Sequence, residues 1–280
     1  MKFALNKYGE EELEEESYVK IKSKKRKLTD RQSITRLVST VSQADVDAPF
    51  ENSDLNELHH MDCLDELICG IKTGKEASVF LGRNSTGLVA VKMYTDIRVR
   101  SFKNDAAYRQ GRFIGDARLK KAIDHRSHRG LDAHQGLWVQ EEFAQMKHLR
   151  EHGVRVPREI AVNGLALVME FIGDENGLPA SRISDLRLEK AEAEEAFRQS
   201  IQNLKRIVAA GRVHGDYSTF NILWHRGEAV VIDFPQVMDL NANPNAKAFL
   251  ERDIRSLCGS FHKLGIAADE RKIMREIRAR

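Results

Sequence analysis

Two aspartates and one asparagine lie close together in residues 213–236, VHGDYSTFNILWHRGEAVVIDFPQ. Asp216 follows a His-Gly pair, Asn221 comes five positions later, and Asp233 follows the apolar run Val-Val-Ile. Carboxylate and amide oxygens are hard ligands that suit Mg²⁺, which usually shares its coordination with substrate phosphates. The stretch therefore predicts a metal-assisted reaction, and phosphoryl transfer from ATP is the first candidate.

Phosphoryl transfer requires a protein mainly to position the reactants and to neutralise charge. Asp216, in a turn just past a predicted helix, is placed to act as a general base. Asn221 and Asp233 are the candidate Mg²⁺ ligands. The pattern D-x4-N followed by IDF matches the catalytic-loop Asp and Asn and the D-F-G Asp of protein kinases.

Three upstream features support this interpretation. Lys92, in VAVKMY, stands where a kinase strand carries its phosphate-binding lysine. Glu142, in a helix predicted over 137–152, is the expected partner of Lys92, with Glu141 beside it as a competing choice. Residues 167–172, LVMEFI, predict a strand that leads into an interlobe hinge whose backbone would bind adenine.

Each of these residues also has a purely structural explanation. His-Gly-Asp is a common turn, and a lysine at the end of a strand is usually a surface residue. Glu142 taken alone predicts a solvated helix face, and Asp233 taken alone could cap a strand. Their joint occurrence, in this order and at these separations, favours a kinase-like fold.

Hydrophobic periodicity predicts the elements that position these residues. We expect helices over 54–68, 137–152, 187–210 and 244–264, and strands over 77–81, 88–94, 159–162 and 165–171. The two strands before Tyr94 form a hairpin around a turn at 82–87. An Asn163-Gly164 turn joins the later pair. A mostly β-rich half followed by a mostly helical half predicts a two-lobed α+β fold of the protein-kinase type.

The same pattern predicts the domain organisation. Residues 1–50 are charged and form a disordered tail and linker. Residues 51–172 form the N-terminal lobe, with the nucleotide-binding hairpin, a basic mobile loop at 98–129 and the helix at 137–152. Residues 173–280 form a helical C-terminal lobe with a catalytic loop at 213–223 and a metal-binding segment at 230–236. Residues 234–280 are too few for an activation segment and peptide-binding helices, so we expect a truncated C-terminal lobe.

Several motifs resemble the RIO atypical protein kinases over residues 55–275. They are TGKEASV (73–79), VAVKMY with Lys92, LVMEFIG (167–173), HGDYSTFNIL (214–223), VIDFPQ (230–236) and ERDIRSLCGSFHKLG (251–265). The pair TGKEA and IDFPQ is specific. The chain looks most like the subgroup without an N-terminal winged helix.

The resemblance implies a Ser/Thr protein kinase or ATPase that uses ATP and Mg²⁺, with Mn²⁺ as an alternative metal. It implies that Asp216 is the catalytic base, that Asn221 and Asp233 hold Mg²⁺, and that Lys92 holds the α- and β-phosphates. In this family the metal-binding Asp, here Asp233, is also proposed to accept phosphate. The remaining implied nucleotide contacts are phosphate contacts from Thr73, Lys75 and Ser78 and hinge backbone contacts from Glu170 and Ile172. Asp253 is expected to hydrogen-bond the catalytic-loop backbone or, equally, to cap a solvent-facing helix.

The net charge of +3 says little about partners, but its distribution is uneven. Residues 20–27 hold six basic residues in eight, and residues 98–129 hold ten Lys or Arg and three Asp. These segments are candidates for a contact with the ribosome or ribosomal RNA, in line with the family's role in small-subunit maturation. A solubilising role is an equal alternative for the loop, and a plain disordered tail is the first expectation for residues 20–27. Ser101 and Ser127 are candidate autophosphorylation sites.

The chain shows no apolar run of signal-peptide or transmembrane length, which predicts a cytoplasmic protein without a membrane contact. Its three cysteines suit reduced thiols better than a disulfide framework or a zinc site. Two rival functions share parts of the pattern. One is a small-molecule phosphotransferase of the aminoglycoside or choline kinase type, and the other is a non-catalytic RNA- or ribosome-binding scaffold.

Overall fold

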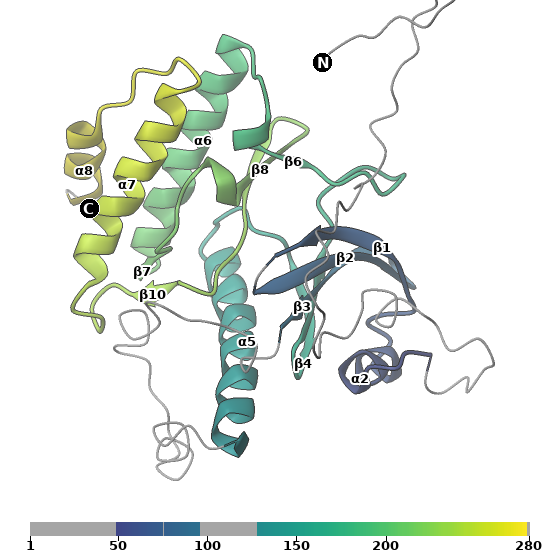
Figure 1. Cartoon of the computed structure of the whole chain (residues 1–280). Helices are drawn as coiled ribbons and strands as arrows, with labels where there is room; N and C mark the ends of the chain where they lie inside the picture. Colours follow the sequence, from purple (N-terminus) through teal and green to yellow (C-terminus); the bar gives the residue numbers. More distant parts are fainter. Residues whose placement is uncertain (1–48, 75, 96–127, 279–280) are drawn as a thin grey trace, which may run out of the picture.

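The computed structural model describes residues 49–74, 76–95 and 128–278, with the backbone alone for 128–134 and 278. The predictions for the tail up to residue 48, for Lys75, Ser101 and Ser127, and for residues 98–127 of the basic loop lie outside the described residues. Within them, the predicted two-lobed α+β fold is confirmed. Figure 1 shows a sheet on one side of the molecule and a group of helices on the other, with one long helix beside both.

The N-terminal lobe is built on a five-stranded antiparallel sheet. Its spatial order is β1-β2-β3-β5-β4, with β1 Glu66–Thr73, β2 Ala77–Asn84, β3 Gly87–Tyr94, β4 Glu159–Asn163 and β5 Ala166–Glu170. Strands β2 and β3 are joined by the short turn Ser85-Thr86, where the Asn84 side chain accepts hydrogen bonds from the backbone and hydroxyl of Thr86. An asparagine that bonds two residues ahead stabilises such turns locally.

Two helices flank this sheet. Helix α2 Ser53–His60 begins at the cap Asn52, whose side chain accepts from the backbone of Asp54 and Leu55. Leu55 and Leu58 are completely buried against β-strand residues of the same lobe, and each such side chain contributes about 1.5–3 kcal/mol. Helix α5 His128–Glu151 packs against β4 and β5 and ends before Gly153, which has a positive φ of 76°.

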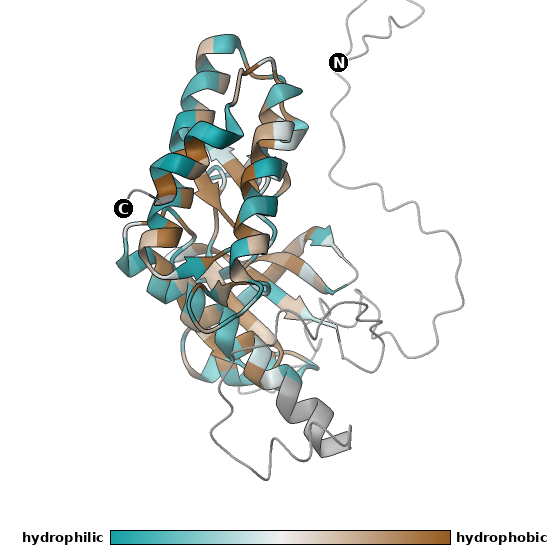
Figure 2. Cartoon of the chain, turned by 90° about the vertical axis from the view of Figure 1, so that its left-hand side faces the viewer, coloured by the Kyte–Doolittle hydropathy of each residue, from teal (hydrophilic) through white to brown (hydrophobic). Residues whose placement is uncertain are grey.

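The C-terminal lobe consists of three helices and two small sheets. Its helices are α6 Lys190–Ala209, α7 Ala246–His262 and α8 Glu270–Arg278. The sheets pair β6 Ser181–Arg182 with β8 Ile222–His225 and β9 Glu228–Val231, and β7 Arg212–Val213 with β10 Met238–Asp239. Short 3₁₀ turns cover Ile183–Asp185 (η2) and Thr219–Asn221 (η3). The helices carry hydrophilic and hydrophobic residues side by side, as amphipathic helices do (Figure 2).

Three predicted boundaries are wrong. The helix predicted over 54–68 ends at His60, and its last three residues belong to strand β1. Asp62, with a φ of 56°, turns the chain out of the helix, and Asn52 is the cap at its start. The helix predicted from residue 137 begins at His128, so the last two residues of the predicted basic loop belong to α5. The hairpin turn occupies two residues rather than 82–87.

None of the helices in the described part of the chain has the length and apolar character that a membrane-spanning segment needs. Cys63, Cys69 and Cys258 are free thiols, as the sequence predicts. Between Asp233 and residue 278 the chain forms β10, α7 and α8.

Candidate active site

Lys92 lies between two carboxylates that come from distant parts of the chain. Its Nζ is 2.8 Å from Oε1 of Glu142, on α5, and 2.8 Å from Oδ1 of Asp233, which follows β9. The Lys92 and Glu142 side chains are only 10% and 2% exposed. Glu142, and not its neighbour Glu141, is therefore the partner of Lys92, because Glu141 accepts instead from Gln145 on the same helix.

The strand pattern explains how a lysine comes to lie at the centre of the lobe. On β3 the neighbours Val91 and Met93 belong to the core beneath α2, so Lys92 points to the opposite face of the sheet. Lys92 pairs across the sheet with Val79 on β2 and Leu167 on β5. That face is covered by α5, which supplies Glu142.

Helix α5 also holds the segment that carries Asp233. The backbone N–H of Phe234 donates to Glu142 Oε1 at 3.2 Å, and the indole N–H of Trp138 donates to the carbonyl of Pro235 at 3.0 Å. Glu142 thus joins β3, α5 and the IDFPQ segment in one arrangement. Within the described residues its second oxygen, Oε2, is buried without a hydrogen-bond partner.

Burial and charge oppose each other in this triad. Burial alone would lower the pKa of Lys92, but Asp233 and Glu142 together raise it above its ordinary value. Burial alone would raise the pKa of Asp233, but the nearby Lys92 ammonium lowers it. Burial raises the pKa of Glu142 in spite of Lys92. Lys92 is therefore cationic and Asp233 anionic at neutral pH.

Asp233 itself has an uncommon backbone conformation. Its φ of 70° lies in the left-handed region, which Asp tolerates better than most residues with a side chain. The N–H of the preceding Ile232 donates to the carbonyl of Asn221 at 3.0 Å, which brings the two predicted metal ligands onto adjacent segments. The Asp233 side chain is 45% exposed, so it remains accessible to a ligand.

The loop that carries Asp216 is held from inside the C-terminal lobe. The buried carboxylate of Asp253, on α7, accepts from the backbone N–H of Gly215 at 2.8 Å and of Tyr217 at 3.0 Å. The hydrogen bonds predicted for Asp253 are therefore present. Gly215 has a φ of 83°, and a Cβ there would lie 2.8 Å from the Gln236 carbonyl oxygen, so the turn requires glycine.

The side chain of Asn221, the last residue of η3, contacts Asp216. Its amide nitrogen donates to the carbonyl oxygen and to the carboxylate Oδ2 of Asp216, each at 2.9 Å. The predicted base and the predicted metal ligand are thus in direct contact. A pocket of about 300 Å³ lies next to them. It is lined by Asp216, Tyr217, Gln236, Arg252, Asp253 and Ser256.

The predicted nucleotide contacts fall at two places. Thr73 and Ser78 face each other at the ends of β1 and β2, where the N–H of Gly74 donates to the Ala77 carbonyl at 2.9 Å. Glu170 ends β5, and Ile172 follows it, with its carbonyl accepting from Ala180 at 2.9 Å. The first place joins β1 to β2, and the second lies at the end of β5; β2 and β5 are the two strands that neighbour β3. Their nucleotide contacts stay predictions.

The donor set suits a metal shared with a nucleotide. Asp233 and Asn221 offer a carboxylate and an amide oxygen, and Mg²⁺ is commonly held by one or two carboxylates together with substrate phosphates. No group of three or more His, Cys, Asp or Glu suited to a metal occurs within residues 49–74, 76–95 and 128–278. Phosphate oxygens and water would complete the coordination.

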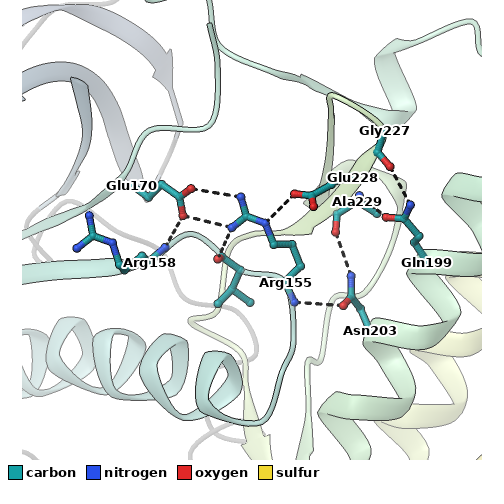
Figure 3. A network of polar contacts seen from close by, with 9 residues as sticks. Arg155, Arg158, Glu170, Gln199, Asn203, Gly227, Glu228 and Ala229 are labelled. Carbon is teal, nitrogen blue, oxygen red and sulfur yellow. Dashed lines mark hydrogen bonds and ion pairs between the residues drawn. The ribbon is translucent and has the colours of Figure 1, made fainter. Parts of the chain in front are cut away.

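Sequence reasoning missed one residue that the geometry makes prominent. Arg155, in the connector between α5 and β4, contacts Glu170 and Glu228, the first residue of β9 (Figure 3). An arginine in a Val-Arg-Val-Pro connector belongs to no periodic pattern, and its partners lie 15 and 73 residues away. The valines on each side of it, Val154 and Val156, are buried, and this alternation was the available signal.

The family model described as RIO domain matches residues 78–273. The RIO-type serine/threonine-protein kinase Rio1 of Haloferax volcanii is 40% identical over 201 residues, which cover 71% of this chain and 64% of the relative. The Rio1 protein of Thermoplasma acidophilum is 34% identical over 142 residues, which cover 51% of this chain and 73% of the relative. The serine/threonine-protein kinase RIO1 of Caenorhabditis elegans is 29% identical, and the chain spans 37% of its length.

A solved structure has the same fold. The Rio2 kinase–ADP/Mg²⁺–phosphoaspartate complex from Chaetomium thermophilum superimposes with a TM-score of 0.57 and 22% identity, covering 75% of this chain and 59% of that one. The fold is therefore that of a protein kinase, as the sequence predicts. The family model covers well over half of the sequence, from β2 to α8. The chain belongs to the RIO domain family.

Proposed function

We propose that this chain is an ATP-dependent RIO-type serine/threonine protein kinase that transfers the γ-phosphate of Mg-ATP. The observation that carries this proposal is the contact of Lys92 with both Glu142 and Asp233, beside the Asn221–Asp216 pair. It supplies a phosphate-binding cation, two metal ligands and a base. The names of the relatives do not favour the two rival functions, a small-molecule phosphotransferase and a non-catalytic scaffold.

Each residue has a distinct role in this proposal. Lys92 holds the α- and β-phosphates, while Glu142 keeps its ammonium in place. Asn221 and Asp233 would hold Mg²⁺, which neutralises charge on the phosphates when bound. Asp216 accepts the proton of the attacking hydroxyl. The other nucleotide contacts are assigned to Thr73, Lys75 and Ser78 at the phosphates and to the backbones of Glu170 and Ile172 at adenine.

The same residues could also catalyse a second reaction, the hydrolysis of ATP through an acyl phosphate. An oxygen of Asp233 can attack the γ-phosphorus, so that an acyl phosphate forms, the bond to the β–γ bridging oxygen breaks and ADP leaves. Water then hydrolyses the acyl phosphate, which makes the chain an ATPase. The related Rio2 kinase was crystallised as an ADP/Mg²⁺–phosphoaspartate complex, and this supports the second reaction.

The finer assignments are proposals of the same kind. Mn²⁺ can replace Mg²⁺, because both metals accept hard oxygen ligands. A polyanionic partner such as the ribosome or ribosomal RNA is supported by the basic composition of residues 20–27 and 98–129. A cytoplasmic location suits such a partner.

The experiment that tests this function is labelling with γ-labelled ATP and Mg²⁺, followed by treatment with hydroxylamine. A label that resists hydroxylamine indicates a phosphoester, and we expect Asp216→Asn to abolish it. A label that hydroxylamine releases indicates an acyl phosphate, and we expect Asp233→Asn to abolish it. Glu141→Gln serves as the matched control, because Glu141 neighbours Glu142 without contacting Lys92. No label and no ATP hydrolysis in the wild-type protein would refute the proposed function.

A further inference from the structure

Arg155 occupies the connector between α5 and β4, at the boundary between the two lobes. Figure 3 shows its side chain between Glu170 on one side and Glu228 on the other. Glu170 is the last residue of β5, at the expected hinge, and Glu228 is the first residue of β9 in the C-terminal lobe. One side chain therefore contacts both lobes.

The contacts with the hinge are made by a fork of two nitrogens. Arg155 Nη1 and Nη2 lie 3.2 Å from Oε2 and Oε1 of Glu170, respectively. Oε2 of Glu170 also accepts from the backbone N–H of Arg158 at 2.9 Å. The planar guanidinium and the carboxylate are held in a defined orientation, which a lysine could not reproduce. The backbone at Glu170 is therefore held through its own side chain.

The contacts with the C-terminal lobe involve both the side chain and the backbone of Arg155. Its Nε lies 3.2 Å from Oε2 of Glu228. Its backbone N–H donates to the side chain of Asn203, a buried residue of α6, at 3.2 Å, and its carbonyl accepts from Val231 at 2.9 Å. Val231 ends β9, two residues before Asp233. The connector is thereby attached to the strand that leads to the metal ligand.

We propose, on the basis of the ATP-dependent function above, that Arg155 is a positioning residue. It joins the hinge, where adenine binds, to β9, which leads to Asp233, and so it sets the affinity for the nucleotide. In this proposal the hinge contacts the adenine base, and Asp233, through the metal, lies at the phosphates. If the connection loosens, the hinge and Asp233 can no longer bind the two ends of one nucleotide together.

The side chains of this ion-pair network are partly exposed, and this distinguishes a role in nucleotide binding from a role in the stability of the fold. The side chains of Arg155, Glu170 and Glu228 are 35%, 33% and 60% exposed. Ion pairs with this exposure contribute little to the free energy of unfolding. Loss of the guanidinium is therefore expected to change nucleotide binding more than the unfolding temperature.

The chain offers a matched control in Arg150. Its guanidinium makes a similar forked contact with Glu159, at 2.9 and 2.7 Å, but both residues belong to the N-terminal lobe, on α5 and β4. Arg150→Ala therefore removes a comparable ion pair without changing a contact between the lobes.

The test compares Arg155→Ala, Arg155→Lys and Arg150→Ala in the full chain. We expect Arg155→Ala to raise the KM for ATP and the Kd for Mg-ADP about fivefold, with kcat changed less than about twofold. Arg155→Lys, which keeps the charge without the fork, is expected to give an intermediate increase. Arg150→Ala is expected to leave both constants unchanged.

A second measurement does not depend on nucleotide binding. Without nucleotide, we expect Arg155→Ala to accelerate amide hydrogen exchange at Val231 and at the hinge residues 170–172 together, while Arg150→Ala does not. Unchanged exchange with unchanged affinity would overturn the proposal, as would equal effects of Arg150→Ala. If the wild-type protein binds no nucleotide, the proposed function fails, and the exchange comparison alone decides whether Arg155 joins the lobes.

Discussion

The side-chain amide of Asn221 donates two hydrogen bonds to Asp216, one to its carbonyl and one to its carboxylate, each at 2.9 Å. The nitrogen of the amide is thereby used to orient the predicted base. The oxygen of the same amide is the atom left to act as a metal ligand, so under the proposed function one side chain would both orient the base and hold the metal.

This double role predicts the behaviour of Asn221→Ala. The variant loses a metal ligand and an orienting donor at once, so we expect kcat to fall by at least about 100-fold. The Mg²⁺ concentration for half-maximal activity should also rise. A magnesium titration at saturating ATP measures both effects, with the exposed Asn176→Ala as the control. An unchanged Mg²⁺ dependence would argue against Asn221 as a ligand.

Lys92→Met should cost stability as well as activity. It leaves Glu142 buried without its cation, and breaking a buried pair from one side costs about 3–5 kcal/mol. The additional change Glu142→Gln removes the uncompensated charge and should recover part of this loss. Chemical denaturation at pH 7 compares the two variants. Equal stabilities would mean that Glu142 is not charged in the single variant.

Asp253→Ala should destabilise the catalytic loop. Two buried backbone donors, at Gly215 and Tyr217, would lose their acceptor, at a total cost of about 2–4 kcal/mol. Asp253→Asn keeps one acceptor oxygen and should lie between wild type and Asp253→Ala. The free energy of unfolding and kcat are measured together, with the exposed Lys247→Ala on the same helix as the control. Wild-type stability in Asp253→Ala would contradict this role.

The left-handed backbone at Asp233 makes a prediction about two inactive variants. Both Asp233→Gly and Asp233→Ala remove the carboxylate, and both leave Lys92 with Glu142 alone. They differ in backbone preference, because glycine adopts a φ of 70° without strain and alanine does not. We expect Asp233→Gly to be more stable by about 1 kcal/mol. Equal unfolding free energies would show that the loop relaxes around the change.

The Arg150–Glu159 pair predicts a pH dependence of stability. The hydrogen bond from Arg150 lowers the pKa of Glu159 below its ordinary value of 4.5. The folded state therefore gains stability from this pair above pH 4.5, and the gain is lost as the pH falls through the lowered pKa. The Arg150 side chain is 41% exposed but that of Glu159 only 7%, so solvent screens the pair only in part and Arg150→Ala should cost about 1 kcal/mol at pH 7. Urea denaturation from pH 7 to pH 3 should show the difference from wild type disappear, and a constant difference would refute the assignment.

The core of the site was predictable from the sequence because kinase chemistry constrains residue type and order. Lys92 and Glu142 were paired correctly, although 50 residues separate them. The spacing of Asp216 and Asn221 predicted that both would lie at one site, and the structure brings them into contact. Such predictions succeed where the chemistry constrains both the residue types and their order along the chain.

Strand β1 was missed for a physical reason. Leu64, Leu67 and Ile68 continue the apolar spacing of the preceding helix, so periodicity alone extends that helix. The break depends on the positive φ of Asp62 and on pairing of β1 with β2, neither of which is visible in the local pattern. Long-range pairing outweighs local propensity here.

The contacts of Arg155 could not be predicted for a related reason. They depend on where a connector without periodicity passes between two lobes, and this is set by the packing of elements far apart in the sequence. Glu170 was expected at the hinge for its backbone, whereas the structure shows that its side chain is also bound.

The ion pair of Lys92 with Asp233 has a consequence for the order of addition. A free Mg²⁺ ion that approaches Asp233 must compete with an ammonium group 2.8 Å away. If the proposed function holds, Mg-ATP would bring a phosphate to Lys92 and a metal to Asp233 together, so that neither charge would be left without a partner. In the protein without nucleotide, the Lys92 ammonium therefore neutralises the Asp233 carboxylate. We expect the protein to be insensitive to free magnesium and to admit the metal only together with the nucleotide.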